Sequence, residues 1–345
     1  MSDKLRVVVT GCGGISAAWF KPATARTDIE IVGLVDLRPE ATEKRAADFN
    51  LKGAVLGTDL NDVLKRTKPD ILFNCTVPEA HAPTTILALK RGCHVLCEKP
   101  LADTMTNARK MLAAARKAGK TFAVMQNRRF DANIRRLRAF LASGALGQIT
   151  TVHSDFFIGA HFGGFRDRME HVLILDMAIH TFDAARLISA ANPVSVYCHE
   201  WNPAGSWYDH DASAVAIFEM SNGIVYSYEG SWCAEGHNTK WECIWRIIGT
   251  KGTLIWDGST GFSAQVVSKA AGFRSELADL PVPEFDAGPN QGSHAGLLND
   301  FIECIKSGRT PETIATDNIH SLAMVHGAIG AAKAGRKLKI ALPEN

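Results

Sequence analysis

The sequence predicts an α/β protein whose first part is a doubly wound parallel sheet. Between about residues 5 and 127, short runs rich in β-branched residues alternate with segments of helical pattern, which is typical of parallel strands joined by helices. Beyond that stretch, one helical segment is followed by many strand-like runs, which indicates a second sheet. At 345 residues and roughly 150 residues per domain, we expect two domains, 1–127 and 128–345.

The expected elements follow from the spacing of apolar residues and turns. In the first domain, strands are expected at 5–10, 29–36, 71–75, 95–97 and 121–125, and helices at 14–26, 39–49, 59–66, 83–91 and 104–118. In the second domain, a helix at 131–142 precedes strands at 148–158, 194–200, 213–220, 223–231, 241–249, 252–257 and 262–267. We expect that sheet to be antiparallel or mixed, residues 268–292 to be a loop, and helices at 293–306 and 317–334 to close the chain.

Composition narrows the class of partner. Lys plus Arg number 38 and Asp plus Glu 36, so the near balance favours a small soluble partner over nucleic acid or an anionic membrane. No uncharged stretch approaches the ~18 apolar residues needed to span a membrane. The eight cysteines fall mostly inside apolar runs and include no CxxC pair, which suits reduced thiols in a cytoplasmic protein.

A glycine turn follows the first expected strand, in the order Gly11-Cys12-Gly13-Gly14-Ile15-Ser16. Such a turn brings backbone N–H groups and a helix start close to a pyrophosphate, where a β-carbon would hold the phosphate away. Asp36 ends the second strand, where a carboxylate can accept hydrogen bonds from the adenosine ribose and repel a 2'-phosphate. Arg38 could instead attract that phosphate, so the pattern favours NAD and leaves NADP open. Ser16 replaces the usual third glycine.

Two further segments follow strands of the same sheet. Glu98-Lys99-Pro100 comes after the strand at 95–97, and ligands of open α/β sheets bind outside the carboxyl ends of the strands. Lys99 is therefore a candidate to face a ligand, before a proline whose bond is a candidate for cis; the alternative is a solvated lysine before a turn. The loop from Asn74 to His81 begins at the same edge, although His81 could simply start a helix. The residues expected to contact a dinucleotide here are Thr76, Pro78, His81, Glu98 and Lys99.

A second candidate site lies at Asp176, His180 and Asp183. If the segment is helical, spacings of four and three place these residues on one face. A histidine between two carboxylates would be more basic, which suits a general base. Two alternatives remain open: a structural salt-bridged histidine, and a metal site formed with His153, Asp155 or His171, which we do not expect to be occupied.

Together these motifs resemble the glucose-fructose oxidoreductase, inositol dehydrogenase and MocA family over essentially the whole chain. The motifs are the glycine turn, Thr76-Val77-Pro78 with His81, Glu98-Lys99-Pro100, Arg128-Arg129-Phe130, Asp176-x-x-x-His180 and Phe301-Ile302-Glu303-x-Ile305-x-x-Gly308-Arg309-x-Pro311. The resemblance implies a Rossmann nicotinamide domain joined to an α/β domain with a large open sheet, and oxidation or reduction of a sugar, polyol or related compound. It also implies that Lys99 and His180 are catalytic and that Asp176, Asp183 and Arg128 contact or orient substrate.

One departure concerns the residues just before the aspartate. Many members carry a glycine-rich run there, whereas this chain has Glu170-His171-Val172-Leu173-Ile174-Leu175. Substrate identity therefore cannot be transferred from any one member.

The expected reaction is hydride transfer between C4 of the nicotinamide and a carbinol carbon, with His180 taking the hydroxyl proton and Lys99 hydrogen-bonding the same oxygen. Two rival functions use the same scaffold: a non-catalytic dinucleotide-sensing regulator and an NAD-dependent glycosidase. The uncovered face of an open sheet and several tryptophans also predict a homodimer or homotetramer. Trp232, Trp241, Trp245 and Trp256 are expected in the core or at a subunit contact rather than as a sugar platform.

Overall fold

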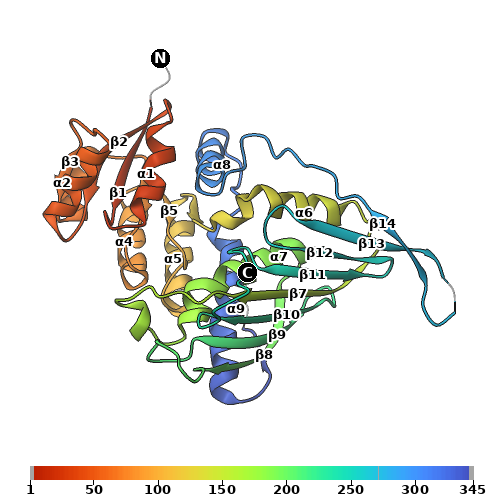
Figure 1. Cartoon of the computed structure of the whole chain (residues 1–345). Helices are drawn as coiled ribbons and strands as arrows, with labels where there is room; N and C mark the ends of the chain where they lie inside the picture. Colours follow the sequence, from red (N-terminus) through yellow and green to blue (C-terminus); the bar gives the residue numbers. More distant parts are fainter. Residues whose placement is uncertain (1–3, 271, 342–345) are drawn as a thin grey trace. The chain divides into compact units, whose positions relative to one another are not determined.

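The computed structural model describes residues 4–270 and 272–341, which divide into two compact units (Figure 1). Unit 1 runs to Phe130 and also contains residues 288–322; unit 2 contains residues 131–287 and the chain from Ala323 onward. The predicted boundary at 127 lies close to the first crossing between units. The segment 288–322 differs from the prediction, because it packs with the first unit and not with the second.

The reason lies in α8 (His294–Ser307). Its buried side chains Leu297, Leu298, Phe301 and Ile302 share one apolar cluster with Trp19 and Phe20 of α1 (Ser16–Thr24). An apolar helix face is stabilised by whichever surface covers it. The sequence pattern shows that such a face exists but not which sheet lies beneath it.

The sheet of unit 1 has six parallel strands in the order β3-β2-β1-β4-β5-β6. The strands are β1 (Leu5–Thr10), β2 (Ile29–Val35), β3 (Val55–Gly57), β4 (Ile71–Asn74), β5 (His94–Cys97) and β6 (Phe122–Val124). Val7 and Val9 belong to the apolar cluster on one face and Val8 to the cluster on the other. Both faces are therefore covered, and the predicted doubly wound sheet is confirmed.

The remaining helices of unit 1 are α2 (Pro39–Asp48), α3 (Leu60–Thr67), α4 (Pro78–Lys90) and α5 (Met105–Ala118). Local chemistry explains several of their starts. The side chain of Asp59 caps α3 by accepting from the Asn61 amide at 2.8 Å, and Thr104 caps α5 in the same way. The helix predicted at 83–91 begins five residues earlier, because Pro78 occupies the first turn, where no backbone donor is needed.

Unit 2 contains a nine-stranded sheet in the order β14-β13-β12-β11-β7-β10-β9-β8-β15. The strands are β7 (Ile149–Phe157), β8 (Pro193–Trp201), β9 (Ser213–Met220), β10 (Val225–Ser231), β11 (Ile244–Gly249), β12 (Gly252–Trp256), β13 (Phe262–Lys269), β14 (Glu276–Leu280) and β15 (Leu338–Lys339). Within this sheet β10 and β7 pair in parallel, whereas the other neighbouring strands pair antiparallel. The expected large, mostly antiparallel sheet is confirmed. β14 falls inside the segment predicted to be a loop.

One face of the large sheet is covered by α7 (Ile179–Ser189). Phe182 of this helix packs edge to face against Phe218 and Tyr228, with ring centroids 4.9 and 5.3 Å apart. Trp232, Trp245 and Trp256 are fully buried, as expected for core residues, whereas Trp241 is half exposed. The other helical elements of this part are α6 (Ala132–Ala142), the 3-10 turn η2 (Arg166–Arg168) and the π-helical segment η3 (Leu173–Ala178), and α9 (Ala315–Ala334) begins in unit 1 and continues in unit 2.

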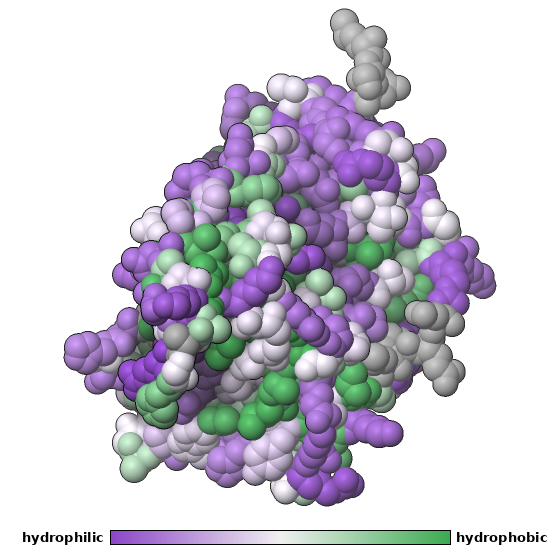
Figure 2. Space-filling model, turned by 90° about the vertical axis from the view of Figure 1, so that its right-hand side faces the viewer, coloured by the Kyte–Doolittle hydropathy of each residue, from purple (hydrophilic) through white to green (hydrophobic). Residues whose placement is uncertain are grey.

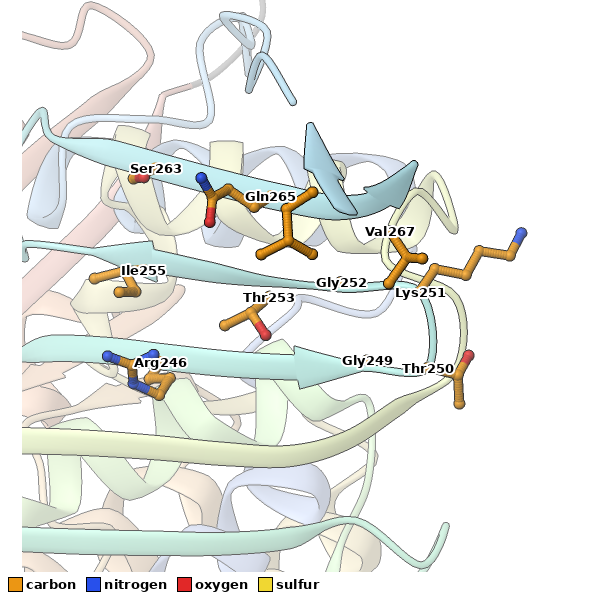
Figure 3. A pocket seen from close by; sticks show the side chains of 11 residues that line it. Arg246, Gly249, Thr250, Lys251, Gly252, Thr253, Ile255, Ser263, Gln265 and Val267 are labelled. Carbon is orange, nitrogen blue, oxygen red and sulfur yellow. The ribbon is translucent and has the colours of Figure 1, made fainter. Parts of the chain in front are cut away.

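The opposite face of the sheet is exposed. Residues alternate along the strands, so that Tyr197 and Ile217 are more than a third exposed while their neighbours in sequence are buried. Ile248, also more than a third exposed, follows the buried Ile247. A depression of about 430 Å³ lies on this face over β11 to β14, and Figure 3 shows Arg246, Thr253, Ile255 and Gln265 on its neighbouring strands. Apolar patches also lie between hydrophilic residues on the surface drawn in Figure 2. Among the described residues, no helix is both long enough and apolar enough to cross a bilayer.

Candidate functional site

A cavity of about 450 Å³ lies at the carboxyl ends of β1, β2 and β4. Its lining includes five residues predicted from the sequence to bind a dinucleotide: Gly11, Gly13, Asp36, Arg38 and Thr76. The order of the sheet reverses between β1 and β4, so this is its topological switch point, where α/β sheets bind ligands. Thr58 and Leu60 also line the cavity. The sequence prediction missed them because it missed β3, which precedes them.

Position 11 requires a glycine, because the loop after β1 passes very close to the loop after β4 there. The φ of Gly11 is +83°, and a β-carbon there would lie 2.5 Å from the carbonyl carbon of Cys75. Gly13 and Gly14 differ, since a β-carbon on either would meet no atom within 4 Å. The open space over these two glycines at the start of α1 is a cradle that side chains would fill. The residues present therefore fit the pyrophosphate of a dinucleotide. Ile15 is the N-cap residue of α1 and is half exposed beside them.

Ser16 and Arg45 hold the turn where a third glycine is usual. The Ser16 hydroxyl donates to the carbonyl of Gly13 at 2.7 Å and accepts from Nε of Arg45 at 3.0 Å. Arg45 also donates from Nη2 to the Gly13 carbonyl at 2.8 Å. Arg45 is a positioning residue that the sequence prediction missed, because it lies on α2, 29 residues after Ser16.

Asp36 lies between the glycine turn and Arg38. Its Oδ2 accepts from the Cys12 amide at 2.8 Å, and its Oδ1 accepts from the Arg38 amide at 3.0 Å. The carboxylate thus helps to hold the turn while it lines the cavity. Burial and the charge of Asp36 raise the pKa of the Cys12 thiol to about 12, so this thiol stays protonated. All eight cysteines are among the described residues and are free.

Hydrogen bonds between its own residues fix the loop after β4. Oδ1 of the fully buried Asn74 accepts from the Thr76 hydroxyl at 2.6 Å and from the Thr76 amide at 3.2 Å. Pro78 starts α4 directly after this loop. His81 is completely buried, with Nδ1 2.8 Å from the Pro100 carbonyl and Nε2 3.0 Å from the Thr76 carbonyl. Its ring contacts the loops around the cavity and is not part of the lining.

Lys99 follows β5 and is partly buried. Its amide donates to Oε2 of Glu98 at 2.7 Å, and Oε1 of the same carboxylate accepts from the indole of Trp19 at 3.0 Å. Glu98 therefore fixes the backbone of Lys99 relative to α1. The Glu98 side chain is only 5% exposed, and both of its carboxylate oxygens are engaged by these two contacts. This geometry indicates that Glu98 positions Lys99. The Lys99–Pro100 bond is cis.

Asp176 and His180 lie where two kinds of helix meet. Asp176 is in η3 and His180 is in the first turn of α7. π-Helical turns inside helices are frequent at functional sites, because they change which side chains share a face. Nε and Nη2 of Arg166 donate to Asp176 at 2.7 and 3.4 Å, and the guanidinium also lies over the rings of Phe162 and Phe165. No spacing rule links Arg166 to the later helix, so the sequence prediction missed it.

The predicted substrate contacts Asp183 and Arg128 lie in different units. Asp183 is 1% exposed, with Oδ1 3.7 Å from Nη1 of Arg186, and Arg186 donates to Asn192 at 2.7 Å. This packing favours a role in holding α7. Arg128 lies in the 3-10 turn η1 (Asn127–Phe130) and is partly buried.

The residues of the alternative metal site are not grouped. Nε2 of His153 is 2.6 Å from Asp155 Oδ1, and His171 Nδ1 is 2.8 Å from Glu200 Oε2. Throughout the part of the chain that the structure describes, no three His, Cys, Asp or Glu side chains are arranged to hold a metal ion.

Comparison with known proteins agrees with this architecture. Residues 5–126 match the GFO_IDH_MocA model, described as an oxidoreductase family with an NAD-binding Rossmann fold, and residues 134–255 match the GFO/IDH/MocA C-terminal domain. The chain is 31% identical to D-glucoside 3-dehydrogenase of Escherichia coli over 67% of this chain and 71% of that protein.

Two solved structures share the fold. An oxidoreductase from Agrobacterium radiobacter, in complex with NAD+, L-tartaric acid and magnesium, has a TM-score of 0.85 at 20% identity and 98% coverage of both chains. Levoglucosan dehydrogenase, in complex with NADH and L-sorbose, has a TM-score of 0.83 at 19% identity over 99% of this chain and 100% of the other. The family models cover most of the chain in the order of its predicted domains. The chain therefore belongs to the GFO/IDH/MocA family of oxidoreductases, with an NAD-binding Rossmann fold in its N-terminal part.

Proposed function

We propose that this protein is a cytoplasmic dehydrogenase that transfers a hydride between NAD and a hydroxyl-bearing carbon of a sugar, polyol or related compound. The observation that carries the proposal is the backbone of Lys99, anchored by Glu98 at the end of β5, in the same sheet as the dinucleotide cavity. The relatives named above include a glucoside dehydrogenase and a levoglucosan dehydrogenase. The free cysteines support a reducing compartment.

The proposed chemistry divides the work between two residues. When bound, the nicotinamide supplies the acceptor for the hydride that leaves the carbinol carbon. His180 takes the hydroxyl proton as the carbon–oxygen double bond forms, and Asp176 supports the charge that His180 gains. The Lys99 ammonium donates a hydrogen bond to the same oxygen and stabilises the negative charge that develops there.

A screen for NADH formation tests this proposal. The purified protein is incubated with NAD and a panel that includes myo-inositol, D-glucose, methyl glucoside, L-sorbose and levoglucosan, and absorbance of NADH is followed. At least one sugar or polyol should give saturable NADH formation. A full panel with no NADH formation, from protein shown to bind NADH, would contradict the proposal.

The preference for NAD is expected to depend on Asp36. Asp36→Asn removes the charge and keeps an oxygen able to accept from the Cys12 amide, whereas Asp36→Ser shortens the side chain and loses that contact. Removing the charge relieves repulsion of a 2'-phosphate and leaves Arg38 free to attract it. In both variants the ratio of the NADP Kd to the NAD Kd should fall by roughly tenfold or more. A wild-type protein that already prefers NADP would contradict this account of Asp36.

We propose that the exposed face of the large sheet pairs with a second copy. Tyr197 pairs with Ile217, and the row continues across the sheet through Ser227, His153, Arg246 and Ile255. Further exposed apolar residues on this face include Val225, Ile244 and Ile248. Exposed apolar side chains gathered on one face of a sheet are typical of an interaction surface.

Light scattering tests the pairing. Wild-type protein should give at least twice 37.4 kDa at micromolar concentration. Ile217→Lys with Ile248→Lys should give the monomer mass, because two buried charges would face the partner. Phe273→Lys is the matched control: it also removes an exposed apolar side chain from unit 2, but Phe273 lies between β13 and β14 and not on a strand of the sheet. A wild-type particle of 37.4 kDa would contradict the pairing.

A further inference from the structure

His81 joins two loops that surround the dinucleotide site. Its Nε2 is 3.0 Å from the carbonyl of Thr76, which lines the cavity, and its Nδ1 is 2.8 Å from the carbonyl of Pro100. Pro100 directly follows Lys99. The ring is completely buried and is absent from the cavity lining, so it acts on the two loops and not on a ligand.

We propose that His81 is a positioning residue that ties the cofactor loop after β4 to the Lys99–Pro100 loop after β5. Through Thr76 it restrains the wall of the dinucleotide cavity, and through Pro100 it restrains the backbone that carries Lys99. The effect on turnover rests on the function proposed above, whereas the restraint on the loops does not.

The chemistry of the two contacts supports this role. Backbone carbonyls accept hydrogen bonds and cannot donate them, so every proton in these contacts comes from the imidazole. Each tautomer of the neutral ring holds one loop, and the protonated ring holds both. Burial lowers the pKa of His81, while its two carbonyl partners and the carboxylates of Glu79 and Asp103 oppose that shift.

Neighbouring contacts make the link rigid. Nδ2 of Asn74 donates to the His81 carbonyl at 3.3 Å and to the Thr85 hydroxyl at 3.1 Å, which fixes the backbone of α4 beneath the ring. Oδ1 of Asn74 accepts from the Thr76 hydroxyl at 2.6 Å. The Thr76 loop is thus held on one side by Asn74 and on the other by His81. On the Lys99 side, Glu98 holds the amide of Lys99 and His81 holds the carbonyl of Pro100.

Hydrogen–deuterium exchange measures the restraint directly, without a substrate. His81→Phe keeps the ring shape and removes both nitrogens, and His81→Gln keeps an amide donor that can reach one carbonyl. In His81→Phe, at least one of the peptides covering 75–80 and 98–104 should exchange roughly tenfold faster, because the neutral ring donates to one loop at a time and its removal costs one hydrogen bond. In His81→Gln, at least one of the two peptides should be closer to wild type. Peptides from β1 and β2 should be unchanged in both variants.

His94→Phe is the matched control. His94 is a partly buried histidine at the start of β5, where its Nδ1 accepts from the Thr121 amide at 3.1 Å. Its replacement removes an imidazole from the same unit without touching either loop, and it should leave both peptides unchanged. Unchanged exchange of both loops in His81→Phe, or equal acceleration across the whole unit, would overturn the restraint.

Kinetics then separates positioning from simple loss of structure. On a polyol identified by the screen, His81→Phe should lower kcat by roughly ten- to a hundredfold, because misplaced reacting groups are costly, while the Kd for NADH should rise by a clearly smaller factor. His81→Gln should recover part of kcat. A wild-type kcat in His81→Phe, or a loss of NADH affinity as large as the loss of kcat, would overturn the positioning role. If the wild type turns over no substrate, the proposed function fails, and the exchange measurement still decides whether His81 restrains the loops.

Discussion

Lys99→Met is expected to lower turnover by roughly two to four orders of magnitude while the protein folds and binds NADH normally. Methionine keeps much of the side-chain volume but removes the donor and the positive charge. The Glu98 contact with residue 99 uses the backbone amide and should survive the change. The loss should therefore appear in kcat on the identified substrate, with the NADH Kd close to wild type.

Lys110→Met provides the control for this variant. Lys110 is an exposed lysine on α5 of the same unit, so its replacement removes one charge away from the cavity. It should leave kcat and the NADH Kd unchanged. Near-normal turnover by a folded, NADH-binding Lys99→Met protein would contradict the assignment of Lys99.

His180→Asn is expected to cause a loss of similar size, because asparagine keeps a polar group but cannot take up a proton near neutrality. In the wild type, the oxidation rate should rise with pH as His180 loses its proton, and the variant should lack this dependence. The double variant with Lys99→Met should lose much less than the product of the two single losses, since groups acting on one atom behave as a unit.

His237→Asn is the matched control for His180→Asn. His237 is exposed, and its φ of +50° is one that asparagine adopts readily. The pH–rate profile of the His237→Asn variant should match that of the wild type. Fully multiplicative losses in the double variant would show that Lys99 and His180 do not act on the same oxygen.

The sequence predicts this fold well where the information is local. The parallel sheet follows from short apolar runs between helical segments, and the glycine turn marks the cofactor edge of that sheet. β3 and β14 were missed for opposite reasons: β3 has only three residues, and the residues of β14 are exposed, so neither shows a clear apolar pattern. Such strands are stabilised by pairing with a neighbouring strand. The residues of the strand itself do not reveal this pairing.

The site shows the same limit. Gly11, Gly13, Asp36 and Thr76 were predicted because each directly follows a strand or lies in a turn. The contacts that position the site join residues far apart in sequence: Ser16 to Arg45, Trp19 to Glu98, and His81 to Pro100. Their side-chain types are common in solvated positions. A single sequence therefore reveals the groups that face a ligand more readily than the groups that hold them in place.

The most direct test of the central claim is the fate of the hydrogen on the carbinol carbon. A substrate found in the screen is prepared with deuterium on the oxidised carbon and incubated with NAD in ordinary water, and the NADH is analysed by mass spectrometry. The account predicts one deuterium at C4 of the nicotinamide for each molecule oxidised, with no exchange with solvent. NADH that carries solvent hydrogen at C4 instead of the deuterium would contradict direct hydride transfer.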